Sequence, residues 1–442
     1  MIPDILFILM WLFAPVIWII IVKVLQDNIL RVSILSGLLF FILLFQYIGL
    51  PILYFGFDEY RLYEIYDEAL ILKISLFTIL STTLLLLGAL TSRMIFGKLQ
   101  KINYLESDST NPRGLIFMCI ILFFICFSML ILFVQEIGIT NVAGIAALGL
   151  VDSNESITML RSSMTNNFSG DYSLYELFFE ELMLFTLFIL FSIKNKTKSF
   201  LFNLLRLIVL IVTTISLTIS AQKAPIMELF FGLLFIHFFR NYSGKVSMTS
   251  VILFSPFAVL FLVLIYQSFM GSDNLSVAFT SVLSRTFTGT IHPIYVYLEY
   301  FPFYSDFLYG STFPNPLSIF DFEPVILTQE IMAWNNPNEA KLGIVGSMPT
   351  IFWVEAYANF SIEGIVIISF ILGFILFSID KIFLLFKHNP LFIAYYVWII
   401  LFFKDLSQTF FSNFFLNPDF IVVTLIFLFF LLINQRGRII LN

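Results

Sequence analysis

The chain has little charge. Asp, Glu, Lys and Arg make up only 12% of its 442 residues, about half of the share that soluble globular domains carry. The length alone would suggest two or three soluble domains, and the scarcity of charge excludes them. Apolar residues reach 60%, including 57 Phe, and the mean hydropathy is +0.98. The composition therefore predicts an integral membrane protein.

Cysteine and targeting signals are scarce too. Cys119 and Cys126 lie seven residues apart in one apolar run, hence on one helix face, and are interpreted as small core residues. Neither a disulfide framework nor a cysteine metal site follows from them.

The first 24 residues lack a basic start and a small-residue cleavage site, and Asp4 precedes the apolar stretch. We expect a retained helix there and not a signal peptide.

Long apolar runs are abundant. They are continuous over about 20 residues, whereas the strands of membrane barrels alternate over roughly 10, so the predicted fold is an all-α polytopic membrane protein. We expect one integral membrane domain over residues 1–442, without internal repeats. Eleven spans are predicted at 4–24, 31–53, 69–92, 115–135, 173–193, 200–219, 224–239, 249–269, 362–386, 391–404 and 419–434.

The basic residues predict the orientation. Of the 23 Lys and Arg, 16 fall in one alternating set of loops and 7 in the other. Because cytoplasmic loops are enriched in Lys and Arg, the N-terminus is predicted outside and the C-terminus inside. The cytoplasmic loops are too short for a soluble catalytic domain, so any chemistry is expected at the outer face. The outer side carries an acidic loop near 54–68, a second loop at 136–172 and a large loop at 270–350.

The large outer loop is rich in proline and aromatic residues. Seven of the 15 prolines fall in residues 291–350, which predicts an ordered, turn-rich cap. Residues 291–310 hold eight aromatic side chains, Tyr295 among them. Two interpretations stay open: an aromatic belt at the membrane interface, or a platform on which sugar rings stack.

Three polar patches near the outer surface need an explanation, since a charge inside a span costs about 2.5–3.5 kcal/mol. The first is "SAQKAPIMELFF", where Lys223 lies in a tight hairpin and Pro225 suits the first turn of the next helix. Lys223 is placed to meet an anion at that helix start. The alternative is a lysine that extends to the interface.

The second patch is "SVLSRTFTGTIHPIYVYLEY". Arg285, His292 and Glu299 are spaced by sevens and would share one face of an uninterrupted helix, although Pro293 disfavours such a helix. The planar guanidinium of Arg285 suits a phosphate group. The alternatives are a salt bridge from Arg285 to Glu299 or Asp273, and a helix-terminus role for His292.

The third patch is "WVEAYANFSIEG". Glu355 and Asn359 are four apart, hence neighbours on one helix face. Glu363 lies at the start of the next span, and Gly364 allows that helix to begin or bend there. The alternative for both glutamates is helix capping and solvation at the interface.

These patches resemble the Wzy-type polymerases of bacterial oligosaccharide repeat units, which make O-antigen and enterobacterial common antigen. "SAQKAPIMELFFGLLF" resembles the family's small-residue basic hairpin, with Lys223 where Arg is expected. "LSRTFTG" supplies an outer-loop arginine, Arg285. "GSMPTIFWVEAYANFSIEGIV" resembles the segment E-x-Y-x-N-F-x-x-x-G, which gives Glu355, Tyr357, Asn359, Phe360 and Gly364.

The resemblance implies a fold related to the lipid-linked-sugar (GT-C-like) glycosyltransferases. It also implies an active site at the periplasmic face of the bacterial inner membrane. The expected substrate is an oligosaccharide on undecaprenyl diphosphate, whose growing chain is moved onto the next lipid-linked repeat. The expected partners are membrane lipid and a Wzz-type chain-length regulator, with no nucleic acid. No metal or other cofactor is expected.

Such a donor already has a good leaving group, so the general acid of a glycosidase is not needed. The enzyme must still stabilise the charge on the departing diphosphate and remove the proton of the attacking hydroxyl. Lys223 and Arg285 are predicted to stabilise the departing diphosphate. Glu355 is the leading base for the attacking hydroxyl, and His292 is the alternative. Substrate binding is assigned to Arg161, Tyr295, Glu299, Tyr357 and Asn359.

Two other functions compete. An O-antigen ligase, which transfers glycan to the lipid A core, would use similar cations and a base. A lipid-linked glycan flippase or transporter would show inverted repeats and ionisable groups deep in several spans. The predicted gathering of charge at one outer surface ranks transport below both enzymes.

Overall fold

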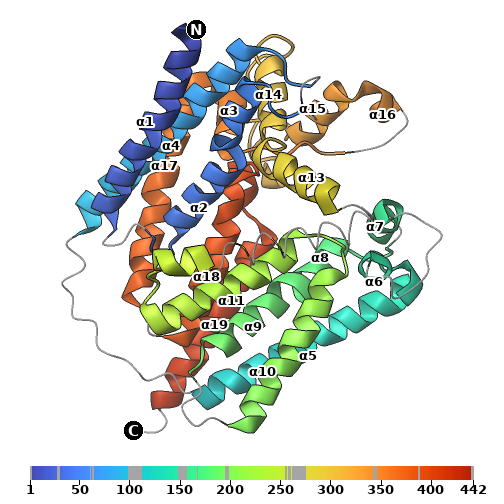
Figure 1. Ribbon diagram of the computed structural model, residues 1–442. Helices are drawn as coiled ribbons and strands as arrows, with labels where there is room; N and C mark the ends of the chain where they lie inside the picture. The colour runs from blue at the N-terminus through green and yellow to red at the C-terminus, as the bar shows by residue number, and fades with distance from the viewer. Residues whose placement is uncertain are drawn as a thin grey trace. The chain divides into compact units, whose positions relative to one another are not determined.

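The described residues form helices joined by turns and loops (Figure 1). Among the residues that the computed structural model describes there is no strand, which confirms the all-α prediction. The described residues are 2–26, 30–59, 61, 64–97, 112–147, 157–166, 168–194, 199–253, 256, 260, 275–341, 346–386 and 389–439.

Eight helical segments of the described chain are long and apolar enough to cross a membrane. Each matches one of the eleven predicted spans, and the chain is therefore a polytopic membrane protein. They are Asp4–Leu25, Ile34–Tyr54, Glu68–Phe96, Pro112–Ile137, Phe200–Thr218, Phe352–Phe383, Pro390–Ser407 and Phe411–Asn434.

The other three predicted spans differ among themselves. The segment 173–193 is helical but changes winding, with α8 (Tyr172–Glu176), the π-helix η4 (Leu177–Leu182) and α9 (Met183–Ser192) in succession. The segment 224–239 lies within α11 (Ala224–Tyr242). The predicted span 249–269 lies largely outside the described residues.

The chain forms two compact units that are interleaved in sequence. The first comprises Met1–Ile102, Thr280–Ile382 and Phe402–Asn417, and the second Asn103–Phe279, Phe383–Leu401 and Pro418–Asn442. The described helices of the first unit are α1 (Ile2–Leu25), α2 (Ile34–Ile42), η1 (Leu43–Tyr47), α3 (Gly49–Tyr54), α4 (Glu68–Phe96), most of α13 (Leu275–Phe287), α14 (Ile291–Tyr300), η5 (Pro316–Ser318), α15 (Leu327–Asn335), α16 (Pro337–Lys341), most of α17 (Phe352–Leu385), η6 (Asp405–Ser407) and η7 (Phe411–Phe414).

The second unit contains α8, η4, α9 and α11, whose bounds are given above. Its other described helices are α5 (Pro112–Ile137), η3 (Ile139–Asn141), α6 (Ala143–Ala147), α7 (Ile157–Asn166), α10 (Phe200–Thr218), most of α18 (Pro390–Lys404) and α19 (Pro418–Ile439).

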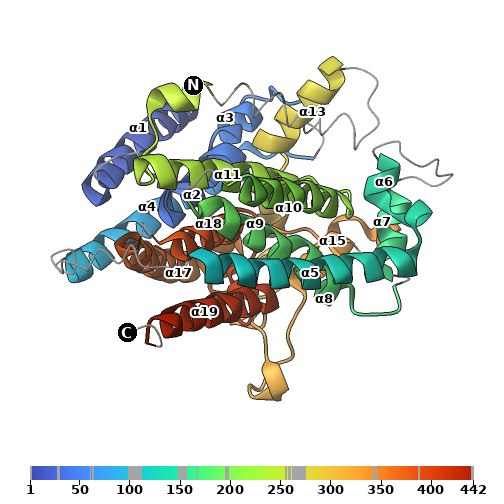
Figure 2. The same cartoon turned by 90° about the horizontal axis from the view of Figure 1, so that it is seen from below.

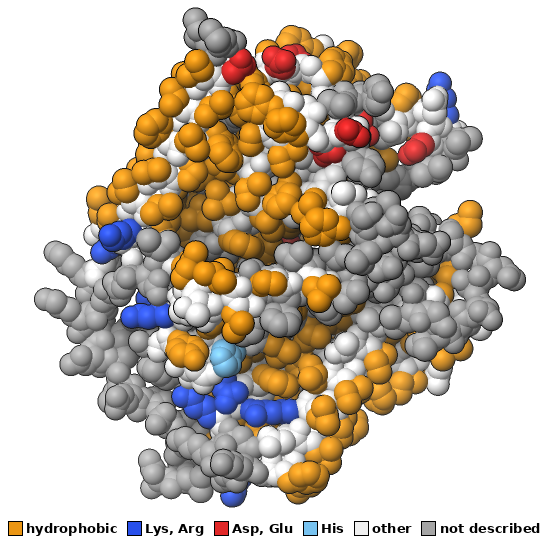
Figure 3. Space-filling view, viewed as in Figure 1, with side chains coloured by type: hydrophobic (Ala, Val, Ile, Leu, Met, Phe, Trp, Pro, Cys, Tyr) orange, Lys and Arg blue, Asp and Glu red, His pale blue; other side chains and the backbone are white. Residues whose placement is uncertain are grey.

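The outer surface of α1 is apolar along its length (Figure 3). Leu6, Phe13 and Ile20 are each more than half exposed, although large apolar side chains in water are unfavourable by about 25 cal/mol per Å². A hydrocarbon environment removes this cost. The exposed face of α1 is therefore the surface expected of a helix in contact with lipid.

Helices α4 and α17 of the first unit lie side by side and approach each other closely (Figure 1, Figure 2). A Cβ atom at Gly88 would lie 2.0 Å from the carbonyl oxygen of Phe370, and one at Gly373 would lie 1.8 Å from that of Leu85. The hydroxyls of Ser92 and Ser378 are 2.8 Å apart. Small residues and hydroxyl hydrogen bonds are the usual means by which membrane helices pack.

Helix α2 begins against a buried carboxylate. The backbone N–H groups of Ile34 and Leu35 donate to the two oxygens of Asp380, at 2.8 and 3.2 Å. Asp380 lies near the end of a membrane-spanning segment, where an unpaired charge would be costly. The free N–H groups and the dipole of α2 stabilise it there.

In the second unit, two arginines hold the end of α9. The Nε atom of Arg206 donates to the Leu190 carbonyl at 2.9 Å, and Nη1 of Arg240 donates to the Phe191 carbonyl at 2.7 Å. The last carbonyls of a helix lack partners within the helix and attract cations. Both arginines belong to the basic set of loops that predicts the cytoplasmic side.

Candidate functional site

The first unit contains a buried polar cluster at the start of α17. Glu355 and Asn359 are both fully buried, and together with Thr312 and Ser412 they form the Glu355 cluster. The hydroxyl of Thr312 donates to Oε1 of Glu355 at 2.7 Å. The backbone N–H of Ser412 donates to Oε2 at 3.1 Å. Both carboxylate oxygens therefore accept a hydrogen bond, as burial requires.

Asn359 joins this cluster to the loop that follows α14. Its Oδ1 atom accepts from the backbone N–H of Gly310 at 2.9 Å, and its Nδ2 atom donates to the Thr312 hydroxyl at 2.8 Å. The same Nδ2 atom also donates to the carbonyl of Glu355 at 2.9 Å. The neighbouring α17 carbonyls of Ala358 and Asn359 accept from Leu308 and Tyr309 of that loop. The position four residues after Glu355 thus fixes the segment that brings Thr312 to the carboxylate.

Helix α17 is interrupted directly after the cluster. Phe360 and Ser361 leave the helical conformation, and Ser361 adopts φ 58° and ψ −149°. A non-glycine residue in this region carries a strain of order 1–3 kcal/mol. Gly364 then passes so close to Ala356 that a Cβ atom would lie 2.1 Å from the Ala356 carbonyl oxygen. The predicted bend is present, three residues before Gly364, and it separates the polar segment 352–359 from the apolar helix that follows.

Tyr357 is held by a lysine that was not among the predicted site residues. The Nζ atom of Lys73 on α4 donates to the Tyr357 hydroxyl at 3.1 Å and lies 5.1 Å from the centre of its ring. Tyr357 also contacts Phe307 edge-on. The position of Lys73 within a predicted span, in "EALILKISLF", is the sequence signal that identifies it, because charge there is costly.

An apolar pocket of about 400 Å³ borders the Glu355 cluster. Gly310, which donates to Asn359, and Phe313, which follows Thr312, belong to its lining. The ring centre of Phe313 lies 5.3 Å from that of Phe411 and 5.6 Å from that of Phe415. Phe411 directly precedes Ser412, so the chain segments that line the pocket also supply both donors to Glu355.

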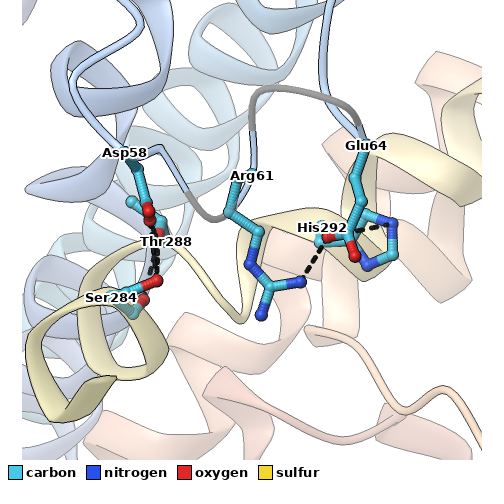
Figure 4. Close-up of polar contacts among 6 residues, drawn as sticks. All are labelled: Asp58, Arg61, Glu64, Ser284, Thr288 and His292. Atoms are coloured by element: carbon cyan, nitrogen blue, oxygen red, sulfur yellow. Dashed lines mark hydrogen bonds and ion pairs between the residues drawn. The ribbon is translucent and has the colours of Figure 1, made fainter. Parts of the chain in front are cut away.

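A second group of polar side chains ties the loop near 54–68 to α13 and α14 (Figure 4). Asp58 accepts hydrogen bonds from the hydroxyls of Ser284, at 2.8 Å, and Thr288. Arg61 pairs with Glu64, whose Oε2 atom lies 3.9 Å from Nε2 of His292. These contacts fix His292 to a loop that the sequence predicts on the outer side.

The environment of His292 favours the neutral imidazole. Its side chain is only 14% exposed, and burial is the main reason why its pKa lies below the usual value of 6.5. Glu64 acts in the opposite direction and Arg61 in the same one. The imidazole is therefore neutral at neutral pH, and its role as the alternative base stays a prediction.

Arg285 does not share a continuous helix with His292 and Glu299, which both lie on α14, seven residues apart and so on one face. Helix α13 ends at Phe287 and α14 begins at Ile291, with turn residues between them. Arg285 is exposed, and the described part of the chain offers it no ion pair within 4.0 Å, Glu299 included. On α14, the Tyr295 hydroxyl accepts from the backbone N–H of Asp67 at 3.3 Å. Tyr295 and His292 therefore both contact the loop near 54–68.

The Lys223 hairpin belongs to the second unit. Pro225 lies in the first turn of α11, as predicted, and Lys223 directly precedes that helix. The hydroxyl of Ser220 donates to Oε1 of Glu180 at 2.8 Å. Glu180 is buried within the π-helix η4. Such local π winding inside a helix is frequent at functional sites. The sequence signal that could have identified Glu180 is its position inside a predicted span, where charge is costly.

The predicted site residues therefore fall into separate groups. The structure brings Glu355 and Asn359 together, places Tyr357 on the same short helical segment, and holds His292 and Tyr295 on α14 against the loop near 54–68. Lys223 and Arg161, which is exposed on α7, lie in the other unit. A shared site of Lys223, Arg285 and Glu355 stays a prediction.

Comparison with known proteins adds no relative. No protein-family model, curated protein or solved structure matches the chain. Among the described residues no three His, Cys, Asp or Glu side chains are grouped to hold a metal ion. The Glu355 cluster offers instead a carboxylate in fixed orientation, a hydroxyl bonded to it, and an adjoining apolar surface.

Proposed function

We propose that the chain is a membrane-embedded glycosyltransferase that polymerises oligosaccharide repeat units carried on undecaprenyl diphosphate. The observation that carries the proposal is the Glu355 cluster. A carboxylate is fully buried at the interrupted start of a membrane helix, and its partner Thr312 is only partly buried. An enzyme that deprotonates a sugar hydroxyl beside a bilayer needs such a base, oriented by its donors and partly shielded from water.

In the proposed reaction, a hydroxyl of the acceptor repeat attacks the anomeric carbon of the donor glycan. The bond from that carbon to the diphosphate oxygen breaks while the new glycosidic bond forms. The hydroxyl proton passes to Glu355, which the alcohol reaches by replacing the Thr312 hydroxyl at Oε1. Asn359 positions this site by holding both Thr312 and the Gly310 segment.

The departing lipid diphosphate carries negative charge that the protein stabilises. Lys223 at the start of α11 and the exposed Arg285 are the proposed cations, and Arg161 is proposed for the acceptor's diphosphate. Removal of one correctly placed charge costs about 10²–10³ in rate. Tyr295, Glu299 and Tyr357 are proposed to contact the sugar or to position the groups that do.

The setting of the reaction is part of the same proposal. We place the site at the periplasmic face of the bacterial inner membrane, with the N-terminus outside and the C-terminus in the cytoplasm. A GT-C-like architecture and a Wzz-type chain-length regulator as partner belong to this hypothesis. The basic loops at the opposite end of the predicted spans support the orientation.

The direct test uses the purified full chain in lipid nanodiscs with a defined repeat unit on undecaprenyl diphosphate. Polymerase activity gives a ladder of lipid-linked products that differ by one repeat. Transfer only when a lipid A core acceptor is added would indicate a ligase. Movement of the substrate across a vesicle bilayer without new glycosidic bonds would indicate a transporter and would overturn the proposal.

A further inference from the structure

The pocket beside the Glu355 cluster has walls without charged side chains. Its lining consists of glycine, proline, leucine and phenylalanine, and four of its rings belong to Phe313, Phe320, Phe322 and Phe415. A volume of about 400 Å³ lies in the range of pockets that bury small organic ligands. A sugar or a phosphate would find no polar partner on these walls, so the pocket suits hydrocarbon.

The loop that forms one wall is held in a defined shape. The Nδ2 atom of Asn315 donates to the carbonyls of Phe320 and Phe322, at 2.9 and 2.6 Å, and its Oδ1 atom accepts from the Phe320 N–H at 3.0 Å. Leu317 and Ser318 both adopt positive φ, a conformation that costs non-glycine residues energy. A strained and internally bonded loop is expected where its shape is used.

The other wall leads into a membrane-spanning segment. Phe415 and Leu416 lie within the first six residues of the span Phe411–Asn434, and both are more than half exposed. On the loop side, Leu317 is 95% exposed and Phe320 56%. Apolar surface of this kind is stable where hydrocarbon covers it. The pocket is therefore continuous with a surface that belongs in the bilayer.

We infer that this pocket binds the isoprenoid chain of the lipid diphosphate, near its head group. The inference rests on the proposed function for the identity of the lipid. The pocket contributes Gly310 and Phe313 on either side of Thr312, so a chain seated there leaves its head group beside the Glu355 carboxylate. Four aromatic rings suit the methyl-branched, unsaturated isoprene units, against which their faces and edges pack.

The experiment uses a diazirine-labelled polyprenyl diphosphate with the full chain in nanodiscs, and photolabelled peptides are mapped by mass spectrometry. The expected labels fall on residues 310–322 and 411–416. Phe320→Asp places a carboxylate at the pocket wall and is expected to lower this labelling by at least about tenfold, because an unpaired charge is strongly disfavoured against hydrocarbon. Unlabelled polyprenyl phosphate should compete with the probe.

The matched control is Ser318→Asp, which adds the same charge to the same loop at an exposed and already polar residue outside the pocket lining. It is expected to keep the labelling. Equal loss in both variants would mean that the loop only inserts into the bilayer, and would overturn the pocket. Equal labelling by a diazirine phospholipid would overturn the choice of an isoprenoid. If Phe320→Asp does not fold, Phe322→Ser is used for the same readout.

The outcome is independent of the test of the proposed function. Labelling of the pocket by a chain that extends no glycan would retain the lipid site and reject the polymerase. Extension of glycan by a chain that is labelled elsewhere would retain the polymerase and reject this site.

Discussion

The hydroxyl of Thr312 lies 2.7 Å from Oε1 of Glu355 and joins the loop after α14 to the first turn of α17. The two residues are 43 positions apart, and neither is near the other in any local pattern of the sequence. Their contact turns a buried glutamate, which would be strongly destabilising alone, into an oriented carboxylate. Thr312, which is partly buried, belongs to the loop that borders the pocket, whereas Glu355 is fully buried.

Asn359 is predicted to be the structural support of this arrangement. Replacement by leucine, in Asn359→Leu, removes the acceptor for the Gly310 N–H and the donor to Thr312. A buried group left without a partner costs about 1–3 kcal/mol, so we expect a clear fall in Tm together with loss of chain extension. Thermal unfolding of the purified protein measures the first effect.

Asn413 supplies the control for that substitution. It is exposed, so Asn413→Leu is expected to change the free energy of unfolding by no more than about 0.5 kcal/mol. Its Tm should therefore stay close to that of the wild type. An Asn359→Leu protein that unfolds at the wild-type temperature would contradict the role of Asn359.

The close contact of α4 and α17 predicts a steric effect at Gly373. Gly373→Ala places a Cβ atom about where the Leu85 carbonyl oxygen lies, 1.8 Å away, so the helices must separate. We expect several kcal/mol of destabilisation, the range that overpacking reaches. Gly97→Ala is the control, because in the described structure no packed neighbour has an atom within 4 Å of its added Cβ. Equal stability of the two variants in a denaturant series would refute the close packing.

The largely buried imidazole of His292 predicts a pH dependence of stability. Its pKa lies below the ordinary 6.5, so the unfolded chain binds the proton more readily than the folded one. This contribution is complete above pH 6.5 and is lost as the pH falls below that value. His292→Gln should reduce the decline of Tm between about pH 7 and 5.

His237 provides the matched substitution for that series, since it is exposed in the described structure. The His237→Gln protein is expected to keep the wild-type pH profile. A His292→Gln profile that coincides with wild type would show that burial of the imidazole does not matter to folding.

Arg285 is predicted to act on the substrate and not on the fold. Its side chain is exposed and has no ion pair within the described residues. Arg285→Ala should therefore leave Tm unchanged and reduce chain extension by about 10²–10³. Arg113→Ala, at the start of α5, is the control and should extend chains normally. Long ladders from cells that carry Arg285→Ala would reject its role.

Much of the fold could be predicted because hydropathy is a local property. Eight spans follow from runs of about 20 apolar residues, which need no knowledge of the contacts between helices. The neighbourhood of Glu355 and Asn359 follows from their spacing of four. The first turn of α11 at Pro225 follows from the fixed φ of proline.

The partners of these residues could not be predicted, because they come from distant segments. Thr312 and Ser412 reach Glu355 only through the path of two loops. The predicted common face of Arg285, His292 and Glu299 holds only for His292 and Glu299 on α14, because the turn between Phe287 and Ile291 separates Arg285 from them. Lys73 and Glu180 were missed although each lies inside a predicted span, where charge needs a specific partner.

The central claim is that Glu355 accepts the proton of the attacking hydroxyl, and Glu355→Gln tests it most directly. Glutamine keeps the size of the side chain and can accept from the Ser412 N–H, while the Thr312 hydroxyl turns to accept from its amide. The variant should retain its Tm and lose chain extension by about 10²–10³ in the nanodisc assay. Glu363→Gln, at an exposed glutamate of the same stretch, should extend chains at the wild-type rate. A folded Glu355→Gln protein that builds ladders as fast as wild type would contradict the account.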